Sequence, residues 1–185
     1  MAKRKLKLQM HISLDGFVND SNGANFNWEK DAKKFSIDNL KNVDSILLGR
    51  KTAEGFIPYW AGVAANPSHE DHKIGKLLTD IPKIILSKKL KQSKWENATV
   101  INGNIADEIK NLKKKKGKDI IVYGGHSFVA SLIQQGLIDE YYFLLNPVAF
   151  GSGEQIFNTI KKGLRLTLQK SRAFKCGTVL LCYTP

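Results

Sequence analysis

Short apolar runs alternate with amphipathic segments along most of this chain of 185 residues. The clearest unit runs from Asp119 to Pro147, in the order strand, Gly124 and Gly125, helix, strand. Strands that alternate with helices favour a largely parallel sheet covered by helices. The sequence therefore predicts an α/β fold that begins with a strand and then a loop over residues 5–18, turning at Asp15 and Gly16, and a further loop over residues 19–27. The other strands are predicted near residues 44–49, 83–87, 98–102, 119–124 and 138–146.

Helices are expected between these strands, over residues 28–42, 50–57, 68–79, 105–116 and 127–135. Pro58 is expected to end the second helix, because proline removes a helical hydrogen bond and clashes with the preceding turn. Segments 164–173 and 178–184 are typical of an antiparallel hairpin. The prediction is a mixed, mostly parallel central sheet flanked by helices, with a C-terminal antiparallel hairpin. Residues 1–185 are predicted to form a single domain, since no repeat or linker interrupts them.

The formal net charge of +12 raises the question of nucleic-acid binding. The lysines are scattered, except for the run from Lys113 to Lys116. That run lies at a predicted helix C-terminus, where it complements the helix dipole. No aromatic residues are interleaved with it, and no nucleic-acid-binding motif accompanies it. We therefore expect no nucleic-acid partner, and an anionic small molecule fits the charge as well.

The start of the sequence, its apolar runs and its two cysteines indicate the cellular compartment. The start is basic and then apolar, but "KLQMHIS" places polar residues at alternate positions, which favours a strand over a signal peptide. No apolar run approaches the ~18 residues of a membrane span. Cys176 and Cys182 would lie too far apart on one strand to bridge easily, and we expect both to be reduced. These features predict a cytoplasmic protein with no membrane association.

Glycines and polar side chains follow the predicted strands, where ligands bind in open α/β sheets. They are Asp15 and Gly16; Gly49, Arg50, Lys51 and Thr52; Ser87, Lys88 and Lys89; and Gly124, Gly125, His126 and Ser127. Glycines admit a phosphate to the backbone, helix N-termini offer free N–H groups, and the other side chains add donors. Each segment alone is weak evidence for a phosphate site. "YGGHSF" departs from the G-x-G-x-x-G pattern, and "GRKT" lacks the four-residue spacer and upstream glycine of a Walker loop. Together they favour a dinucleotide.

The stretches "SILLGRKTAEGF", "KIILSKK" and "IIVYGGHSFVASLIQQGLIDEYYFLLNPVAFGSGEQIF" together resemble the dihydrofolate reductase-like superfamily. The branch they resemble most contains the C-terminal reductase domain of bacterial riboflavin biosynthesis enzymes and its stand-alone relatives. The resemblance implies NADPH as the cofactor and hydride transfer to a small heterocyclic or related C=N or C=O substrate. It also implies a homodimer. The apolar segment from Asp139 to Phe150 lends modest support, although a central strand covered on both faces would have the same composition.

The resemblance also implies site residues. Gly49, Arg50, Lys51 and Thr52 would lie at the cofactor phosphates, Ser87 and Lys88 near the 2′-phosphate, and Gly124 and Gly125 under the pyrophosphate, with His126 and Ser127 following. Asp15 and Gly16 complete the predicted cofactor site. "WEKDAKKF" resembles the helix that carries the substrate-binding acid of dihydrofolate reductases, and Asp31 falls at that position, with Glu29 as a rival. A solvated carboxylate favoured by the helix dipole is the alternative for Asp31.

Aromatic residues near the first two helices are candidates for a substrate wall. Trp28 and Tyr59 are predicted to bind substrate, beside Phe26 and Trp60, although core packing would also account for such residues. His11 is expected to be an ordinary strand residue. His69 and His72 have a spacing that could hold a metal, but no third ligand is near, so we predict no metal site.

Three functions remain open at this point. The first is an NADPH-dependent reductase of a small heterocycle or a related compound. The second is the riboflavin-pathway reduction of a ribosylaminopyrimidine phosphate, which the lack of a deaminase motif "H-x-E…C-x-x-C" makes less favoured. The third is a non-enzymatic nucleotide-binding or nucleic-acid-binding module.

Overall fold

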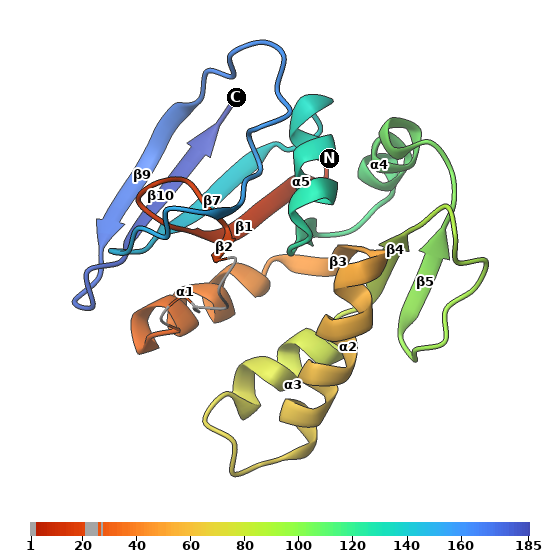
Figure 1. Ribbon diagram of the computed structural model, residues 1–185. Helices are drawn as coiled ribbons and strands as arrows, with labels where there is room; N and C mark the ends of the chain where they lie inside the picture. The colour runs from red at the N-terminus through yellow and green to blue at the C-terminus, as the bar shows by residue number, and fades with distance from the viewer. Residues whose placement is uncertain (1–2, 21–25, 27) are drawn as a thin grey trace.

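The structure is a computed structural model that describes residues 3–20, 26 and 28–185 (Figure 1). Part of the loop expected after the first strand, residues 21–25 and 27, lies outside the described residues. The strands are β1 (Leu6–Ile12), β2 (Asn19–Asp20), β3 (Val43–Gly49), β4 (Lys83–Leu86), β5 (Ala98–Ile101), β6 (Asp119–Val122), β7 (Glu140–Leu145), β8 (Gly153–Glu154), β9 (Thr167–Ala173) and β10 (Val179–Thr184). The helices are α1 (Lys30–Leu40), α2 (Arg50–Ala65), α3 (His72–Asp80), α4 (Ile105–Lys114) and α5 (His126–Gln134).

The central sheet has eight strands in the order β5-β4-β3-β6-β1-β7-β10-β9. From β5 to β7 every neighbouring pair is parallel, whereas β10 runs antiparallel to both β7 and β9. β2 and β8 form a separate two-stranded sheet. The mixed, mostly parallel sheet and the C-terminal hairpin that the sequence predicts are therefore confirmed.

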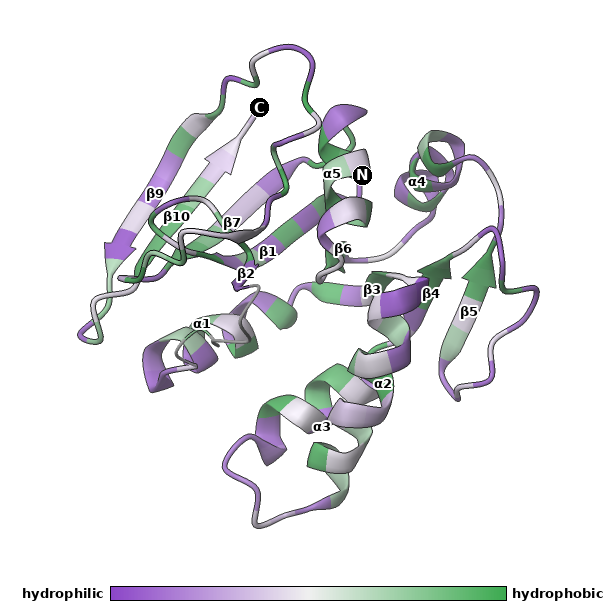
Figure 2. Ribbon diagram, in the orientation of Figure 1, coloured by the Kyte–Doolittle hydropathy of each residue, from purple (hydrophilic) through white to green (hydrophobic). Residues whose placement is uncertain are grey.

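Helices cover both faces of the sheet. One core contains Ile109 and Leu112 of α4 together with Val129 and Leu132 of α5. Another core contains residues of the other three helices, Leu40 of α1, Ala53 of α2, and Ile74 and Leu78 of α3. Figure 1 shows α1, α2 and α3 gathered below the sheet, with α4 and α5 above. In Figure 2 β4 and β5 are mainly hydrophobic, whereas the edge strand β9 is largely hydrophilic and is exposed along its whole length.

The expectation that Pro58 ends a helix is wrong, because α2 continues through it to Ala65. The segment after the proline packs closely on α3. A Cβ atom added to Gly75 of α3 would lie 2.6 Å from Cγ1 of Val63, so only a glycine allows this approach. Packing of this kind offsets the helical hydrogen bond that a proline removes. Helix α3 also begins later than expected, at His72.

Strand β7 lies inside the sheet, between β1 and β10. Its partners and the helices around it account for its apolar composition, so that composition carries no information about a dimer. No helix in the described part of the chain is long and apolar enough to span a bilayer.

Candidate active site

The strands β1, β3, β4 and β6 are parallel, so their carboxyl ends meet at one edge of the sheet. The four predicted ligand-binding segments follow these strands and are therefore brought to the same edge. Two pockets lie there, and Gly124 and Gly125 line one each.

The first pocket, called here the anion pocket, has a volume of about 330 Å³. It is lined by Gly49, Arg50, Lys51, Thr52, Leu86, Gly125, Ser127, Phe128 and Ser131. Six of these nine residues belong to the cofactor site predicted from the sequence. Arg50 also forms an ion pair with Glu54, with 2.7 Å between Nη1 and Oε1.

Two helices begin at the anion pocket, and each has a glycine as its N-cap. These glycines are Gly49 for α2 and Gly125 for α5, and neither helix has a side-chain cap among the described residues. The first N–H groups of both helices therefore lack a helical partner and carry the positive end of the helix dipole. Two such ends at one pocket, with Arg50 and Lys51 beside them, suit a ligand that bears two linked phosphates.

The glycine turn itself requires glycine. Gly124 and Gly125 have φ angles of +59° and +70°, in the left-handed region that other residues rarely adopt. A Cβ atom at Gly125 would lie 2.7 Å from Oγ1 of Thr52, which is closer than atoms can pack. The turn is thus held close to Thr52, and it leaves the backbone open to a ligand. These observations fit the pyrophosphate of a dinucleotide.

Ser87 and Lys88 follow β4, beside the anion pocket. Ser87 is buried, and its hydroxyl accepts hydrogen bonds from the backbone N–H groups of Lys89 and Leu90, at 3.1 Å and 3.0 Å. It therefore orders the turn that presents the exposed Lys88. Neither residue lines the anion pocket, and their predicted role at a 2′-phosphate stays a prediction.

Asp15 links two loops at this edge of the sheet. Its carboxylate accepts hydrogen bonds from the Ser13 hydroxyl at 2.6 Å and from the backbone N–H groups of Phe150 and Gly151, at 3.1 Å and 2.7 Å. The Ser13 hydroxyl, followed by the Gly151 N–H, lowers the pKa of Asp15 below its ordinary value. Gly16 forms the turn beside it at φ +86°. His126 makes a similar link, with its Nε2 atom 2.9 Å from Oε2 of Glu154.

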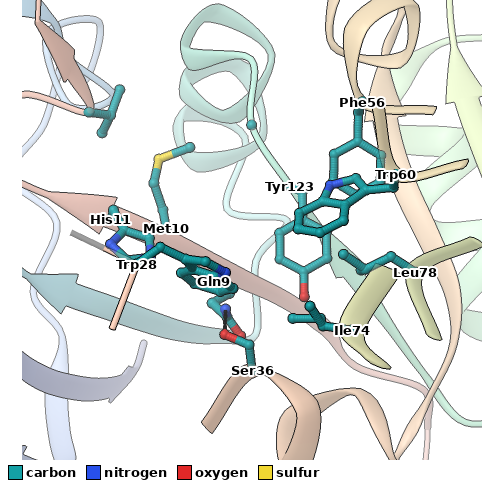
Figure 3. Close-up of a pocket in the computed structure, with 12 residues that line it drawn as sticks. Gln9, Met10, His11, Trp28, Ser36, Phe56, Trp60, Ile74, Leu78 and Tyr123 are labelled. Atoms are coloured by element: carbon teal, nitrogen blue, oxygen red, sulfur yellow. Dashed lines mark hydrogen bonds between the residues drawn. The ribbon is translucent and has the colours of Figure 1, made fainter. Parts of the chain in front are cut away.

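The second pocket, called here the apolar pocket, has a volume of about 220 Å³. Its lining residues are Gln9, Met10, His11, Val18, Trp28, Ser36, Phe56, Trp60, Ile74, Leu78, Tyr123 and Gly124. In Figure 3 His11 and Trp28 lie on one side, while Tyr123, Phe56 and Trp60 lie on the other. The Phe56 and Tyr123 rings are stacked, with centroids 5.7 Å apart and an interplanar angle of 21°. Flat aromatic walls of this kind suit a planar ring.

The predicted substrate-side residues differ in where they lie. Trp28 lines the apolar pocket, as its predicted role requires, whereas Tyr59 is 57% exposed and lies beside Trp60, which does line the pocket. Asp31 is half-buried in the first turn of α1, and Glu29 is exposed just before it. Neither carboxylate is among the lining side chains, and Ser36 is the residue that α1 contributes. A catalytic role for Asp31 stays a prediction.

Residues that the sequence analysis missed also line the apolar pocket. Burial lowers the pKa of His11 to about 4 and raises the pKa of Tyr123 above its ordinary value, so both side chains are neutral at pH 7. Tyr123 directly precedes Gly124, and that position could have identified it. His11 lies on β1, where alternation alone does not separate a pocket residue from an ordinary strand residue.

His69 and His72, whose spacing could hold a metal, lie just before α3 and at its first residue. Nδ1 of His69 accepts a hydrogen bond from the backbone N–H of Asp71 at 3.0 Å, which occupies one of its two nitrogens. Within the described residues no three His, Cys, Asp or Glu side chains form a metal-binding group.

Comparisons with known proteins agree with this fold. Residues 4–180 match the family described as the RibD C-terminal domain. The chain is 32% identical over 186 residues to an uncharacterized protein of Bacillus subtilis (strain 168), YyaP, a match that covers 99% of this chain and 96% of that protein. A putative riboflavin biosynthesis protein from Shewanella sp. PV-4 has a similar structure, with a TM-score of 0.75 at 18% identity over 97% of this chain and 98% of that one. Dihydrofolate reductase from Enterococcus faecalis, solved with NADP(H), gives a TM-score of 0.60 at 16% identity over 97% and 95%.

Proposed function

The chain belongs to the RibD C-terminal domain family, and from this premise we propose that it is an NADPH-dependent reductase of a small ring compound. One observation carries the proposal. The anion pocket and the apolar pocket meet at the turn of Gly124 and Gly125, so one extended ligand can place its phosphates in the first and its ring at the second. A dinucleotide with a nicotinamide ring has this shape.

The residues of the anion pocket would hold the cofactor. The N-termini of α2 and α5 would bind the pyrophosphate through backbone N–H groups, and Arg50 and Lys51 would add charge. Lys88, exposed after β4, would favour a 2′-phosphate over a bare ribose. The dihydrofolate reductase of similar fold was solved with NADP(H), which supports this choice. When bound, NADPH supplies a hydride.

The residues of the apolar pocket would hold the substrate. Phe56, Trp60 and Tyr123 would pack against a planar ring and exclude water, which strengthens every hydrogen bond made inside. Asp31 is proposed as a proton donor on the strength of the resemblance alone. Because it does not line the pocket, such a role would require a water molecule or a movement of α1.

Titration with NADPH, with NADH as the control, tests the cofactor part of the proposal. Enhanced nicotinamide fluorescence or energy transfer from tryptophan should saturate with NADPH at lower concentration than with NADH. A screen of small unsaturated ring compounds for loss of absorbance by NADPH then tests turnover. Equal affinities for both cofactors would contradict the 2′-phosphate site. NADPH binding without turnover of any ring compound would favour the non-enzymatic nucleotide-binding alternative.

A further inference from the structure

Among the described residues, the walls of the apolar pocket carry hydrogen-bond donors and no charged side chain. We infer that this pocket takes a neutral ring carbonyl compound whose oxygen accepts a hydrogen bond from Nε2–H of His11. The inference rests on the proposed reductase function and deepens it by naming the substrate class. It separates ring ketones, enones and lactams from the aminopyrimidines and pterins that present an edge of N–H groups.

The direction of the hydrogen bond follows from Asn146, at the end of β7. The Nδ2 amide group of Asn146 donates to the carbonyl oxygen of Leu144 at 2.6 Å, so this side of the amide is the NH₂ group. The same nitrogen lies 3.2 Å from Nδ1 of His11. Two N–H groups cannot face each other in a hydrogen bond, so Nδ1 accepts and the ring proton of neutral His11 is on Nε2. The Thr178 hydroxyl, 3.5 Å from Oδ1 of Asn146, holds the other side of the amide.

Nε2 of His11 is buried and has no hydrogen-bond partner among the described residues. Nε1 of Trp28, which also lines the pocket, is likewise buried without a hydrogen-bond partner among the described residues. The centroids of the His11 and Trp28 rings lie 5.4 Å apart. A buried donor without an acceptor is unfavourable, because it has lost its hydrogen bond to water. A ligand that brings an acceptor to this side of the pocket recovers part of that free energy, whereas a ligand that brings only donors does not.

Two further polar side chains on the walls, Gln9 and Ser36, already have hydrogen-bond partners within the protein. Nε2 of Gln9 donates to the Ser36 hydroxyl at 2.7 Å, and Oε1 of Gln9 accepts from Asn39 at 2.9 Å. The Ser36 hydroxyl in turn donates to the carbonyl oxygen of Ala32 at 2.9 Å. These groups therefore satisfy one another. A protonated pterin or a diaminopyrimidine would need a carboxylate here, and the described lining provides none.

The chemistry of a carbonyl reduction agrees with a donor that keeps its proton. NADPH would supply a hydride to the carbonyl carbon, the π electrons would move to the oxygen, and a proton from water, or from Asp31 through water, would complete the alcohol. With a pKa of about 4, His11 is neutral at pH 7, and loss of Nε2–H would leave an unstable imidazolate. His11 would therefore stabilise the developing negative charge on oxygen as a hydrogen-bond donor and not act as the general acid.

A matched pair of ligands tests the inference without the reaction. 1-Indanone and indane have the same fused ring system, and only the ketone carries an acceptor. Because indane is the more hydrophobic, an apolar pocket without a donor would prefer it. We expect the wild-type protein to bind 1-indanone about tenfold more tightly in an NMR titration, as one hydrogen bond allows. A donor-edge probe, 2,4-diaminoquinazoline, should bind more weakly than 1-indanone.

Two substitutions of His11 provide the matched variants. His11→Phe keeps an aromatic ring and removes the donor, so the preference for 1-indanone should disappear. His11→Gln places an amide N–H near the position of Nε2, so the preference should be largely retained. The infrared carbonyl stretch of bound 1-indanone gives a second readout, and it should shift to lower frequency in the wild type and His11→Gln but not in His11→Phe.

Several results would overturn the inference. They are tighter binding of indane or of the diaminoquinazoline to the wild type, an unchanged preference in folded His11→Phe, or no binding of 1-indanone at millimolar concentration with or without NADP⁺. Circular dichroism establishes that each variant is folded. Failure of the proposed reductase function would instead appear as an absence of NADPH binding, which is measured separately.

Discussion

Replacing Gly125 with alanine tests whether the glycine turn serves the fold, the cofactor or both. Gly125 has a φ of +70° and is the N-cap of α5. A Cβ atom there would lie 2.7 Å from Oγ1 of Thr52 and 3.6 Å from Cβ of Phe128. Gly136, just after α5, offers a matched control, because its φ is +61° and nothing lies within 4 Å of an added Cβ atom. The two alanine variants share the backbone strain, and only the first adds a contact.

The expected costs follow from these distances. An alanine in the left-handed region costs about 1–2 kcal/mol, and this should be the whole effect of Gly136→Ala. In Gly125→Ala the Thr52 side chain or the turn must move, which adds about 1–3 kcal/mol. A domain with a typical stability of about 5–15 kcal/mol should remain folded in both cases. Because the turn of Gly125→Ala is displaced from the anion pocket, NADPH should bind at least about tenfold more weakly.

Urea unfolding and NADPH titration measure the two effects on the same samples. Excess NADPH should raise the free energy of unfolding of the wild type and of Gly136→Ala by the same amount, and that of Gly125→Ala by less. A double variant, Gly125→Ala with Thr52→Ala, should recover stability without recovering NADPH affinity. A folded Gly125→Ala variant that binds NADPH as tightly as the wild type would refute the role of this turn in binding the cofactor. Equal losses of stability in the two single variants would refute the contact with Thr52.

Three further predictions follow from other parts of the structure. Lys88→Glu should weaken the binding of NADPH by about 1.5–3 kcal/mol and the binding of NADH much less, as measured by fluorescence titration. Equal losses of affinity for the two cofactors would show that Lys88 does not contact the 2′-phosphate. The free energy of unfolding should fall between pH 6.5 and pH 4, because the unfolded chain protonates His11 first, at its ordinary pKa of 6.5, while the folded pKa is about 4. The free energy of unfolding should fall by up to about 3 kcal/mol, and urea unfolding at several pH values should show a smaller fall for His11→Phe. The same pH dependence in the variant and the wild type would contradict the burial of His11. The homodimer implied by the resemblance is proposed to form at micromolar concentration, and light scattering would contradict it by giving the 20.7 kDa mass of one chain at all concentrations.

The sequence predicts the sheet well because its strands are short apolar runs with clear ends. "KIIL" is followed at once by Ser87, and "DIIV" is followed by Tyr123 and then Gly124, so the position of each ligand-binding segment at the sheet edge could be derived before the structure. The anion pocket follows from that placement alone. Helix α2 was harder to predict, because the packing of Val63 against Gly75 involves a partner that lies twelve residues away in the chain.

The apolar pocket is the part of the site that the sequence predicts least well. Its polar groups depend on side-chain orientation across elements distant in sequence, such as the contact between His11 and Asn146, which are 135 residues apart. No local pattern encodes such a pair. Tyr59 and Trp60 show the same limit, since adjacent aromatic residues on a helix point in different directions and only Trp60 lines the pocket.

The lining of the apolar pocket also bears on the riboflavin-pathway alternative. A ribosylaminopyrimidine phosphate presents a phosphate at one end and a ring edge with amino groups at the other. The phosphate calls for a basic partner and the amino edge for acceptors, and the described lining contains neither a Lys nor an Arg and no free carboxylate. The basic residues Arg50 and Lys51 lie in the anion pocket, where the cofactor is proposed to bind. Within the described lining of this pocket both substrate groups would therefore be poorly paired, and burying unpaired polar groups costs about 1–3 kcal/mol each. For this reason a neutral ring carbonyl suits the pocket better than the riboflavin-pathway substrate, even though the fold is shared with a putative riboflavin biosynthesis protein.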